Sequence, residues 1–146
     1  MEGKIRWGVI GSGGIARRRT IPEGIVEASN ARLAAVHDID PAVNAAVARE
    51  HGARAAASLD DLLGDDVDAV YVATPVFLHH EQVLRCARAG KHVLCEKPLG
   101  SDVPQAQEMV RACEEAGVRL GVGFMMRFHA QHRAALNFIR DGKIGK

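Results

Sequence analysis

Short apolar segments alternate with longer helical segments along the chain, and this alternation restricts the possible fold more than any other feature of the sequence. Five apolar segments have the length of buried strands: residues 5–10, 32–37, 68–75, 92–95 and 119–124. Strands that are separated by helices of ten or more residues form a parallel sheet with helices on both faces. Because the crossovers of such a sheet are right-handed, we predict a doubly wound, Rossmann-type α/β fold in a single domain.

Residues that commonly begin and end helices support this alternation. Asp40 followed by Pro41 predicts a helix start, since an acidic N-cap accepts backbone N–H bonds and proline suits the first turn. Ser58 and Asp61 predict a short helix that begins with a variant of the capping box. Glycine favours the left-handed conformation that closes a helix C-terminus. Four helical segments are followed by such a glycine: Gly52, Gly90, Gly117 and Gly142.

A glycine-rich turn follows the first apolar segment directly. Its six residues fit the pattern G-x-G-x-x-A: Gly11, Ser12, Gly13, Gly14, Ile15 and Ala16. In dinucleotide-binding domains the first glycine permits a tight turn and the second lets the pyrophosphate approach the backbone, while the small sixth residue lets the helix pack on the strand. The unpaired N–H groups at the start of the next helix favour phosphate oxygens. We therefore expect these six residues to bind a dinucleotide.

An acidic residue at the end of the second apolar segment completes this pattern. Asp38 lies at about the spacing of 20 residues expected for the residue that binds the ribose hydroxyls of the cofactor. Its carboxylate would repel a 2′-phosphate, so we predict NAD as the cofactor and regard NADP as less favoured. Two alternatives remain open. Asp40 can take the place of Asp38, and the run of arginines at 17–19 can hold a phosphate instead of forming a solvated helix face.

Two tripeptides stand at the carboxyl ends of the apolar segments 68–75 and 92–95. They are Ala73-Thr74-Pro75 and Glu96-Lys97-Pro98. Ligands of open α/β sheets bind beyond the carboxyl ends of the strands, so both tripeptides should face one crevice. A lysine in such a crevice can hold a substrate hydroxyl or take part in proton transfer. Lys97 is therefore the candidate catalytic residue, with a solvated lysine at a strand end as the alternative.

These motifs, in this order, resemble the family of glucose-fructose oxidoreductase, inositol 2-dehydrogenase and the rhizopine catabolism protein MocA. The resemblance rests on WGVIGSGGIA at residues 7–16, VATPVFLHHEQVLRCARAGKHVLCEKPLG at 72–100 and GFMMRFH at 123–129. It implies that Lys97 is the catalytic lysine of a Glu-Lys-Pro motif, beside the nicotinamide and the substrate carbinol. It also implies that Glu96 contacts the cofactor ribose.

The resemblance assigns four further residues to the nicotinamide end of the cofactor. Thr74, Pro75 and His79 would line the nicotinamide side, and Arg127 would lie near the nicotinamide ring. One position departs from the family, because Val76 follows Thr-Pro where many members have asparagine. A polar contact to the cofactor is therefore expected to be lost there.

The resemblance also bears on how the chain is divided. Members of the family continue into a second α/β domain with a large open sheet, which supplies a histidine and usually an aspartate to the active site. We expect residues 1–124 to form the NAD(P)-binding domain and residues 125–146 to form a connecting helix toward a second domain that is absent from this sequence. Three apolar residues of that helix should be packing residues whose surface is partly bare here: Leu136, Phe138 and Ile139.

The function that follows is hydride transfer between NAD(P) and a hydroxyl of a sugar, a cyclitol or a related polyol. Two other functions stay open. The chain can be a non-catalytic dinucleotide-binding module or a truncated cofactor-binding fragment. A methyltransferase-like α/β domain is a weaker alternative, since it would explain the glycine turn and not the lysine motif. For a longer form of the protein we expect a homo-oligomer.

Composition excludes several other kinds of partner. The net charge is +1, which gives no electrostatic footprint for nucleic acid or for a membrane surface. No apolar run is long enough to span a bilayer, and we see no secretion signal. Cys86, Cys95 and Cys113 form no CxxC pair, so we expect reduced thiols in a cytoplasmic protein. We expect no metal at His79 and His80, because adjacent residues of a helix face different sides.

Overall fold

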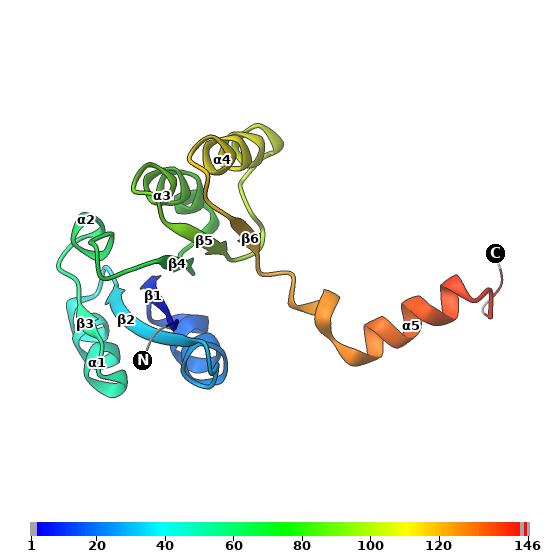
Figure 1. The fold of residues 1–146 in the computed structure, drawn as a ribbon, viewed down its shortest axis with the longest axis horizontal. Helices are drawn as coiled ribbons and strands as arrows, with labels where there is room; N and C mark the ends of the chain where they lie inside the picture. The colour runs from blue at the N-terminus through cyan, green and yellow to red at the C-terminus, as the bar shows by residue number, and fades with distance from the viewer. Residues whose placement is uncertain (1–2, 144, 146) are drawn as a thin grey trace.

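The structure is a computed structural model that describes residues 3–143 and residue 145 (Figure 1). Its strands form one sheet with the order β3-β2-β1-β4-β5-β6, and each neighbouring pair is parallel. The strands are β1 (Ile5–Ile10), β2 (Ala31–His37), β3 (Arg54–Ala55), β4 (Ala69–Val72), β5 (His92–Cys95) and β6 (Leu120–Val122). This strand order is that of the doubly wound dinucleotide-binding fold, so the predicted fold class is confirmed.

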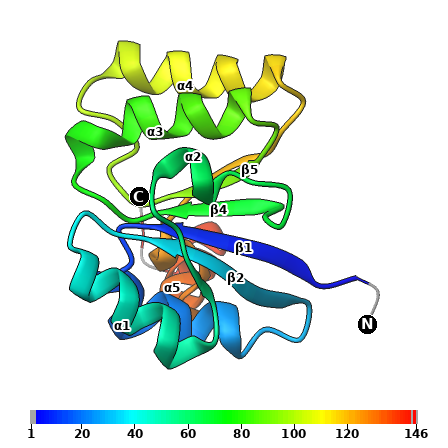
Figure 2. The same cartoon turned by 90° about the vertical axis from the view of Figure 1, so that its left-hand side faces the viewer.

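Helices cover both faces of the sheet (Figure 2). On one face lie α2 (Leu59–Leu62), α3 (Val76–Arg88) and α4 (Val103–Glu115). On the other face lie η1 (Ala16–Val26) and α1 (Pro41–His51). The connections run first from β1 toward β3 and then from β3 toward β6, and because such crossovers are right-handed, the two directions place their helices on opposite faces.

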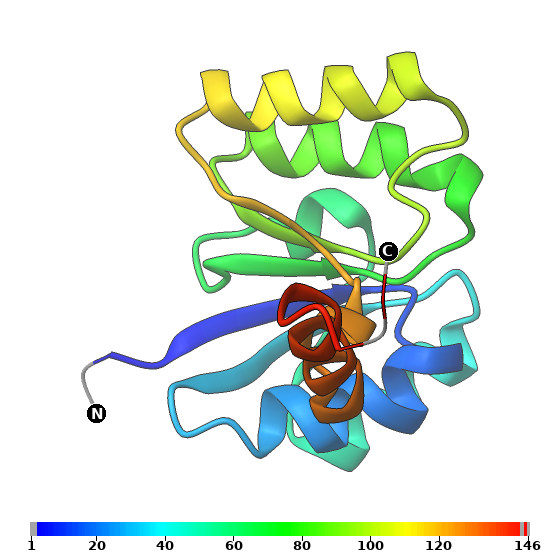
Figure 3. The ribbon, with the colours of Figure 1, turned by 90° about the vertical axis from the view of Figure 1, so that its right-hand side faces the viewer.

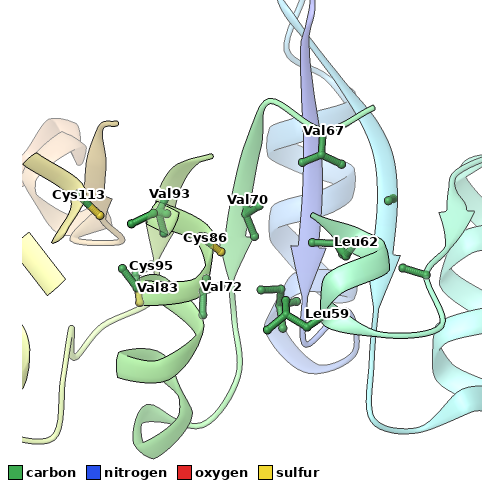
Figure 4. Close-up of a cluster of buried hydrophobic side chains, with 14 of the residues drawn as sticks. Leu59, Leu62, Val67, Val70, Val72, Val83, Cys86, Val93, Cys95 and Cys113 are labelled. Atoms are coloured by element: carbon green, nitrogen blue, oxygen red, sulfur yellow. The ribbon is translucent and has the colours of Figure 1, made fainter. Parts of the chain in front are cut away.

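A separate hydrophobic core lies on each face of the sheet. Figure 4 shows the core on the α3 side, where Val70 and Val72 of β4 meet Val83 and Cys86 of α3. Tyr71, between the two valines, belongs instead to the core under η1 and α1. Successive side chains of a strand point to opposite faces, so a strand covered on both faces must be apolar throughout. This explains the continuous apolar sequence of β4.

The fourth strand is shorter than the sequence predicts. The expected strand covers residues 68–75, whereas β4 ends at Val72. The N–H of Ala73 still donates to the carbonyl oxygen of Ile10 at 2.9 Å, but the chain then leaves the sheet. Pro75 is the N-cap of α3, and proline cannot donate to a strand ladder. The apolar run therefore continues past the point where pairing stops.

The expected helix boundaries are confirmed. Asp40 caps α1, its carboxylate accepting from the N–H groups of Ala42 and Val43. Ser58 caps α2 by accepting from the N–H of Asp61 at 3.1 Å. The four helix-ending glycines all have left-handed φ values between 63° and 69°: Gly52, Gly90, Gly117 and Gly142.

The helix after the glycine turn differs from an ordinary α-helix. Residues Ala16–Val26 form a π-helix that contains Pro22. A π-helix is wider than an α-helix and is usually confined to a single turn. Ala16, Ile21 and Ile25 are its buried residues, and they pack against the sheet in the core that contains Tyr71.

Beyond β6 the chain leaves the sheet. A short 3₁₀ helix, η2 (Met125–Phe128), is followed by α5 (Ala130–Arg140), which projects away from the domain (Figures 1 and 3). Every residue of α5 is exposed. Its three large apolar side chains are between 44% and 54% exposed, so the expected packing is not made by the described residues and the surface is bare: Leu136, Phe138 and Ile139. None of the helices described between residues 3 and 143 is long and apolar enough to cross a membrane.

Candidate functional site

A cavity of about 820 Å³ opens at the carboxyl ends of β1, β2 and β4. This volume lies in the range of small-molecule and cofactor sites. Seven of the residues predicted from the sequence line it: Gly11, Gly13, Gly14, Asp38, Ala73, Thr74 and Pro75. The structure therefore brings together the glycine turn, the acid after β2 and the segment after β4 in one crevice, at the point where the strand order reverses.

Gly11 lets the end of β4 approach the glycine turn. Its φ is +75°, and a Cβ at this position would lie 3.0 Å from the main-chain carbonyl of Ala73. The N–H of Gly11 donates to the carbonyl oxygen of His37 at 2.9 Å. The ends of β1, β2 and β4 are thus held close together, which only glycine permits at position 11.

The side chain of Asp38 lies over the glycine turn. Its Oδ2 accepts from the N–H of Gly13 at 2.9 Å, and its Oδ1 accepts from the N–H of Asp40 at 3.0 Å. Asp40 itself is engaged as the N-cap of α1 and does not line the crevice. This geometry favours Asp38 over Asp40 as the acid of the site.

The arginine run lies outside the crevice. Arg17 pairs with Glu50 of α1 at 3.1 Å, and Arg19 pairs with Glu23 at 2.9 Å. The Nε of Arg18 donates to the carbonyl oxygen of Gly14. All three arginines are exposed, and the crevice lining contains none of them. Their placement fits the interpretation of a solvated helix face.

The other three residues of the glycine-rich motif lie outside the crevice. Ser12 is fully buried, and its Oγ has no hydrogen-bond partner among the described residues. Ala16 is also fully buried at the start of η1. Ile15 is partly buried. None of these three residues lines the crevice, so any contact of theirs with a ligand would come from the main chain or from the Ser12 hydroxyl.

His79 connects the two tripeptides that the sequence singles out. Its ring is 1% exposed, with Nε2 2.8 Å from the carbonyl oxygen of Thr74 and Nδ1 3.0 Å from that of Pro98. The side chain of His79 therefore fixes the ends of β4 and β5 relative to each other and does not line the crevice. Among the described residues no group of three or more His, Cys, Asp or Glu side chains is suited to a metal ion.

A second, partly buried hydrogen-bond network holds Glu96. The hydroxyl of Tyr71 donates to Glu96 Oε1 at 2.6 Å, and the hydroxyl of Thr20 donates to the Tyr71 oxygen at 3.1 Å. Glu96 Oε2 accepts from the main-chain N–H of Lys97 at 3.1 Å. Burial, and then the carboxylate of Glu96, raise the pKa of Tyr71 above its usual value. Tyr71 was not expected as a site residue, although a single hydroxyl in an otherwise apolar buried strand is a recognisable signal.

Of the nicotinamide-side candidates, only Thr74 and Pro75 line the crevice. Lys97 is exposed at the end of β5, and neither it nor Glu96 lines the 820 Å³ cavity. Arg127 lies in η2, beside a different cavity of about 610 Å³ that His132 and Leu136 of α5 also line. The structure thus gathers the glycine turn, Asp38 and the segment after β4 in one crevice, and Arg127 lies at another cavity.

The chain matches a protein family described as "Oxidoreductase family, NAD-binding Rossmann fold" over residues 5–124. It is 46% identical to a 1,5-anhydro-D-fructose reductase from Ensifer adhaerens over 97% of this chain and 42% of the relative. Its fold is similar to that of a 3-ketoreductase from Actinomadura kijaniata in complex with TDP-benzene and NADP, with a TM-score of 0.93, 38% identity, and coverage of 99% of this chain and 46% of the other.

A second similar structure binds the other form of the cofactor. The WlbA dehydrogenase from Bordetella pertussis, in complex with NADH and UDP-GlcNAcA, has a TM-score of 0.91 and 35% identity, covering 100% of this chain and 42% of that protein. The chain therefore spans less than half the length of the relatives it matches.

Proposed function

Because the chain belongs to the Gfo/Idh/MocA family of oxidoreductases, we propose that it provides the nucleotide-binding part of an NAD(P)-dependent dehydrogenase. The proposed reaction moves a hydride between the nicotinamide and a hydroxyl-bearing carbon of a sugar, a cyclitol or a related polyol. The observation that carries this proposal is the crevice that joins the glycine turn, Asp38 and Thr74 at the switch point of the sheet. Sugar-directed relatives support the substrate class.

The residues of the crevice fit a dinucleotide. A Cβ at Gly13 would lie 3.2 Å from Val43 and 3.4 Å from the Asp38 carboxylate, so the space over this turn is kept free by glycine. The N–H of Gly13 becomes available to a phosphate oxygen once Asp38 moves aside, and the buried hydroxyl of Ser12 beside it has no hydrogen-bond partner among the described residues. When bound, the cofactor supplies the hydride chemistry, and the protein supplies its position.

We further propose that NAD is preferred over NADP. Asp38 lines the crevice and is the acid nearest the glycine turn, and a carboxylate repels a 2′-phosphate. The arginines at 17–19 are engaged elsewhere. Relatives of this fold bind NADP in one case and NADH in another, so the choice has to be measured for this chain.

Lys97 is the proposed catalytic residue. Glu96 fixes its main chain through the N–H of Lys97, and Tyr71 in turn fixes the carboxylate of Glu96. The exposed ammonium of Lys97 can then hold the substrate hydroxyl and take part in its proton transfer. For Arg127 and His79 we propose the roles that the resemblance implies, at the nicotinamide end of the cofactor. His79 would act there by fixing the position of Thr74.

One observation favours the second candidate function, a dinucleotide-binding module without catalysis. Neither Lys97 nor Glu96 lines the crevice. Hydride transfer requires the donor and acceptor to be held about 3–3.5 Å apart in aligned geometry, which needs walls on both sides of the nicotinamide. Both functions therefore predict cofactor binding, and only the enzyme predicts turnover.

We also propose the cytoplasm as the compartment, because the three cysteines are all free.

The test combines binding and turnover. NADH is titrated calorimetrically into the wild-type chain and into Gly13→Val, whose side chain would meet Val43 and Asp38. Binding in the wild type that the variant largely loses supports the site. Equal binding in both proteins overturns it. Steady-state assays with a panel of sugars and inositols, with Lys97→Ala as the control, then distinguish the enzyme from the binding module.

A further inference from the structure

Exposed apolar side chains are concentrated in one segment of the molecule. In the described part of the chain, seven of the thirteen large apolar side chains that are exposed lie between residues 124 and 139. Three of the seven belong to α5, which projects away from the domain and is exposed along its whole length (Figures 1 and 3). Apolar surface gathered in this way marks an interaction site.

The apolar face of α5 is bordered by positive charge. Leu136 lies three residues from Arg133 and four from Arg140, so both arginines are its neighbours on the helix surface. Ile139, three residues beyond Leu136, extends the apolar face. Between residues 125 and 143 the sequence has four basic residues and one acidic residue, a net charge of +3. Two copies of α5 side by side would bring these charges together, so α5 is not expected to pair with itself.

A different helix, α4, combines exposed apolar side chains with negative charge. Val103 and Val110 are 67% and 41% exposed and lie two helical turns apart, on the same side of α4. With Leu99 they line a cavity of about 550 Å³ on the surface. Together with its N-cap Asp102, α4 has four acidic residues and one basic residue, a net charge of −3. Among the described helices of eight or more residues, α4 alone is negative.

The charged side chains of the two helices are available to each other. Glu114 and Glu115 are exposed in the last turn of α4, and Arg133 and Arg140 are exposed on α5. None of these four side chains forms an ion pair within the described part of the chain. The lengths also match, because at 1.5 Å per residue the 11 residues of α5 span about 16 Å and the 13 of α4 about 20 Å.

We propose that α5 of one copy of the chain packs along α4 of a second copy, and that the second copy returns the same contact. Leu136 and Ile139 would then cover Val103 and Val110, and the arginines of α5 would lie among the acidic residues of α4. Two reciprocal contacts are related by a two-fold axis, so the assembly closes as a dimer. The inference goes beyond the proposed function and does not depend on it, since neither helix lines the cofactor crevice.

The experiment exchanges charge between two variants of the 146-residue chain. One variant carries Arg133→Glu and Arg140→Glu, and the other carries Glu114→Arg and Glu115→Arg. In sedimentation equilibrium the wild type should approach twice the monomer mass as its concentration is raised. Each variant alone brings like charges together, so its dimerisation should weaken by about tenfold or more. An equal mixture of the two variants should dimerise within severalfold of the wild type, because both contacts are complementary again.

Controls distinguish this contact from a loss of folding. Arg32→Glu is the matched charge reversal, because Arg32 is exposed on β2, away from both helices, and it should leave the wild-type dimer unchanged. Thermal melting establishes that each variant is folded. Leu136→Ala with Ile139→Ala should weaken the dimer without any change of charge, since these substitutions remove the apolar part of the contact.

Three results would overturn the proposal. The first is a wild type that stays monomeric up to its solubility limit. The second is a mixture of the charge-reversed variants that stays monomeric while the wild type dimerises, or a variant that dimerises alone as the wild type does, since α5 and α4 then do not meet. The third is binding of the wild type to anionic phospholipid vesicles without self-association, which would assign the apolar face of α5 to a lipid surface.

Discussion

Replacing Asp38 should change the choice between NAD and NADP. In the structure the Asp38 carboxylate accepts from the N–H groups of Gly13 and Asp40 at 2.9 and 3.0 Å. A bond from the ribose hydroxyls to this carboxylate is charge-assisted and contributes about 1.5–3 kcal/mol, or roughly ten- to a hundredfold in affinity. Because Asp38 gives up its bond to Gly13 when the ribose binds, the net loss on removing it should lie at the lower end, about tenfold.

The same substitution should leave NADPH binding almost unchanged or improve it. Asp38→Ala removes the negative charge that opposes a 2′-phosphate, so the NADH to NADPH affinity ratio should fall by about tenfold or more. The affinity ratio of Asp38→Asn should lie between those of the wild type and Asp38→Ala, since asparagine retains a hydrogen-bond acceptor and loses the charge. Calorimetric titration of each protein with NADH and NADPH, at one ionic strength, measures the ratio directly.

Asp40→Ala is the matched control for this prediction. Asp40 caps α1 and does not line the crevice, so its removal should cost about 1 kcal/mol of stability and leave the cofactor ratio unchanged. A wild type that prefers NADPH, or a ratio that Asp38→Ala leaves unaltered, would refute the reasoning. A ratio that moves with Asp40→Ala would transfer the role to that residue.

Three further predictions concern titratable groups. Hydrogen bonds from Arg6 lower the pKa of Asp68 to about 2. The stability that these bonds contribute is therefore complete above pH 3.8 and is lost as the pH falls toward 2. Urea unfolding should show this loss in the wild type and not in Asp68→Asn. The raised pKa of Tyr71 predicts that stability falls as the pH rises above 10, and Tyr71→Phe, whose unfolding is followed under the same conditions, should lack that fall. The three cysteines are buried, and burial raises the pKa of the Cys86 and Cys95 thiols to about 12, so a thiol reagent at pH 8 should react slowly until denaturant is added; fast labelling of the native chain would contradict this burial.

The fold can be predicted because its signals are local. The glycine turn requires a glycine at position 11 for its left-handed φ and for the approach of Ala73, and the sequence shows that glycine directly after an apolar strand. Asp40 and Ser58 cap the starts of their helices by accepting from N–H groups only two or three residues away. Strand and helix therefore follow from neighbours in the sequence, and right-handed crossovers then leave few possible topologies.

The partners of the polar side chains cannot be predicted in the same way. Glu96 meets Tyr71 across two strands, and Asp38 meets Gly13, both pairs being 25 residues apart in the chain. The resemblance implies a position near the nicotinamide for His79, but its burial between two carbonyl oxygens depends on how α3 lies over the ends of β4 and β5. Such contacts are set by tertiary packing and not by spacing.

Arg127 illustrates a different limit. A motif locates it shortly after β6, and the domain core does not extend to that part of the chain. Its neighbours in η2 and α5 are exposed, so few contacts to the sheet fix its direction. The residue type is readable from the sequence, whereas its position relative to the crevice is not.

The central place of β1 in the sheet has a consequence for synthesis of the chain. β1 pairs on one side with β2 and on the other with β4, and Arg6 bonds to Asp68, 62 residues later. A chain emerging from the ribosome can form the β1–β2 pair early, but the other edge of β1 stays unpaired until Ala69–Val72 has been made. An unpaired apolar edge readily pairs with another chain. A nascent chain interrupted before β4 should therefore aggregate more readily than one that has completed the sheet through β6.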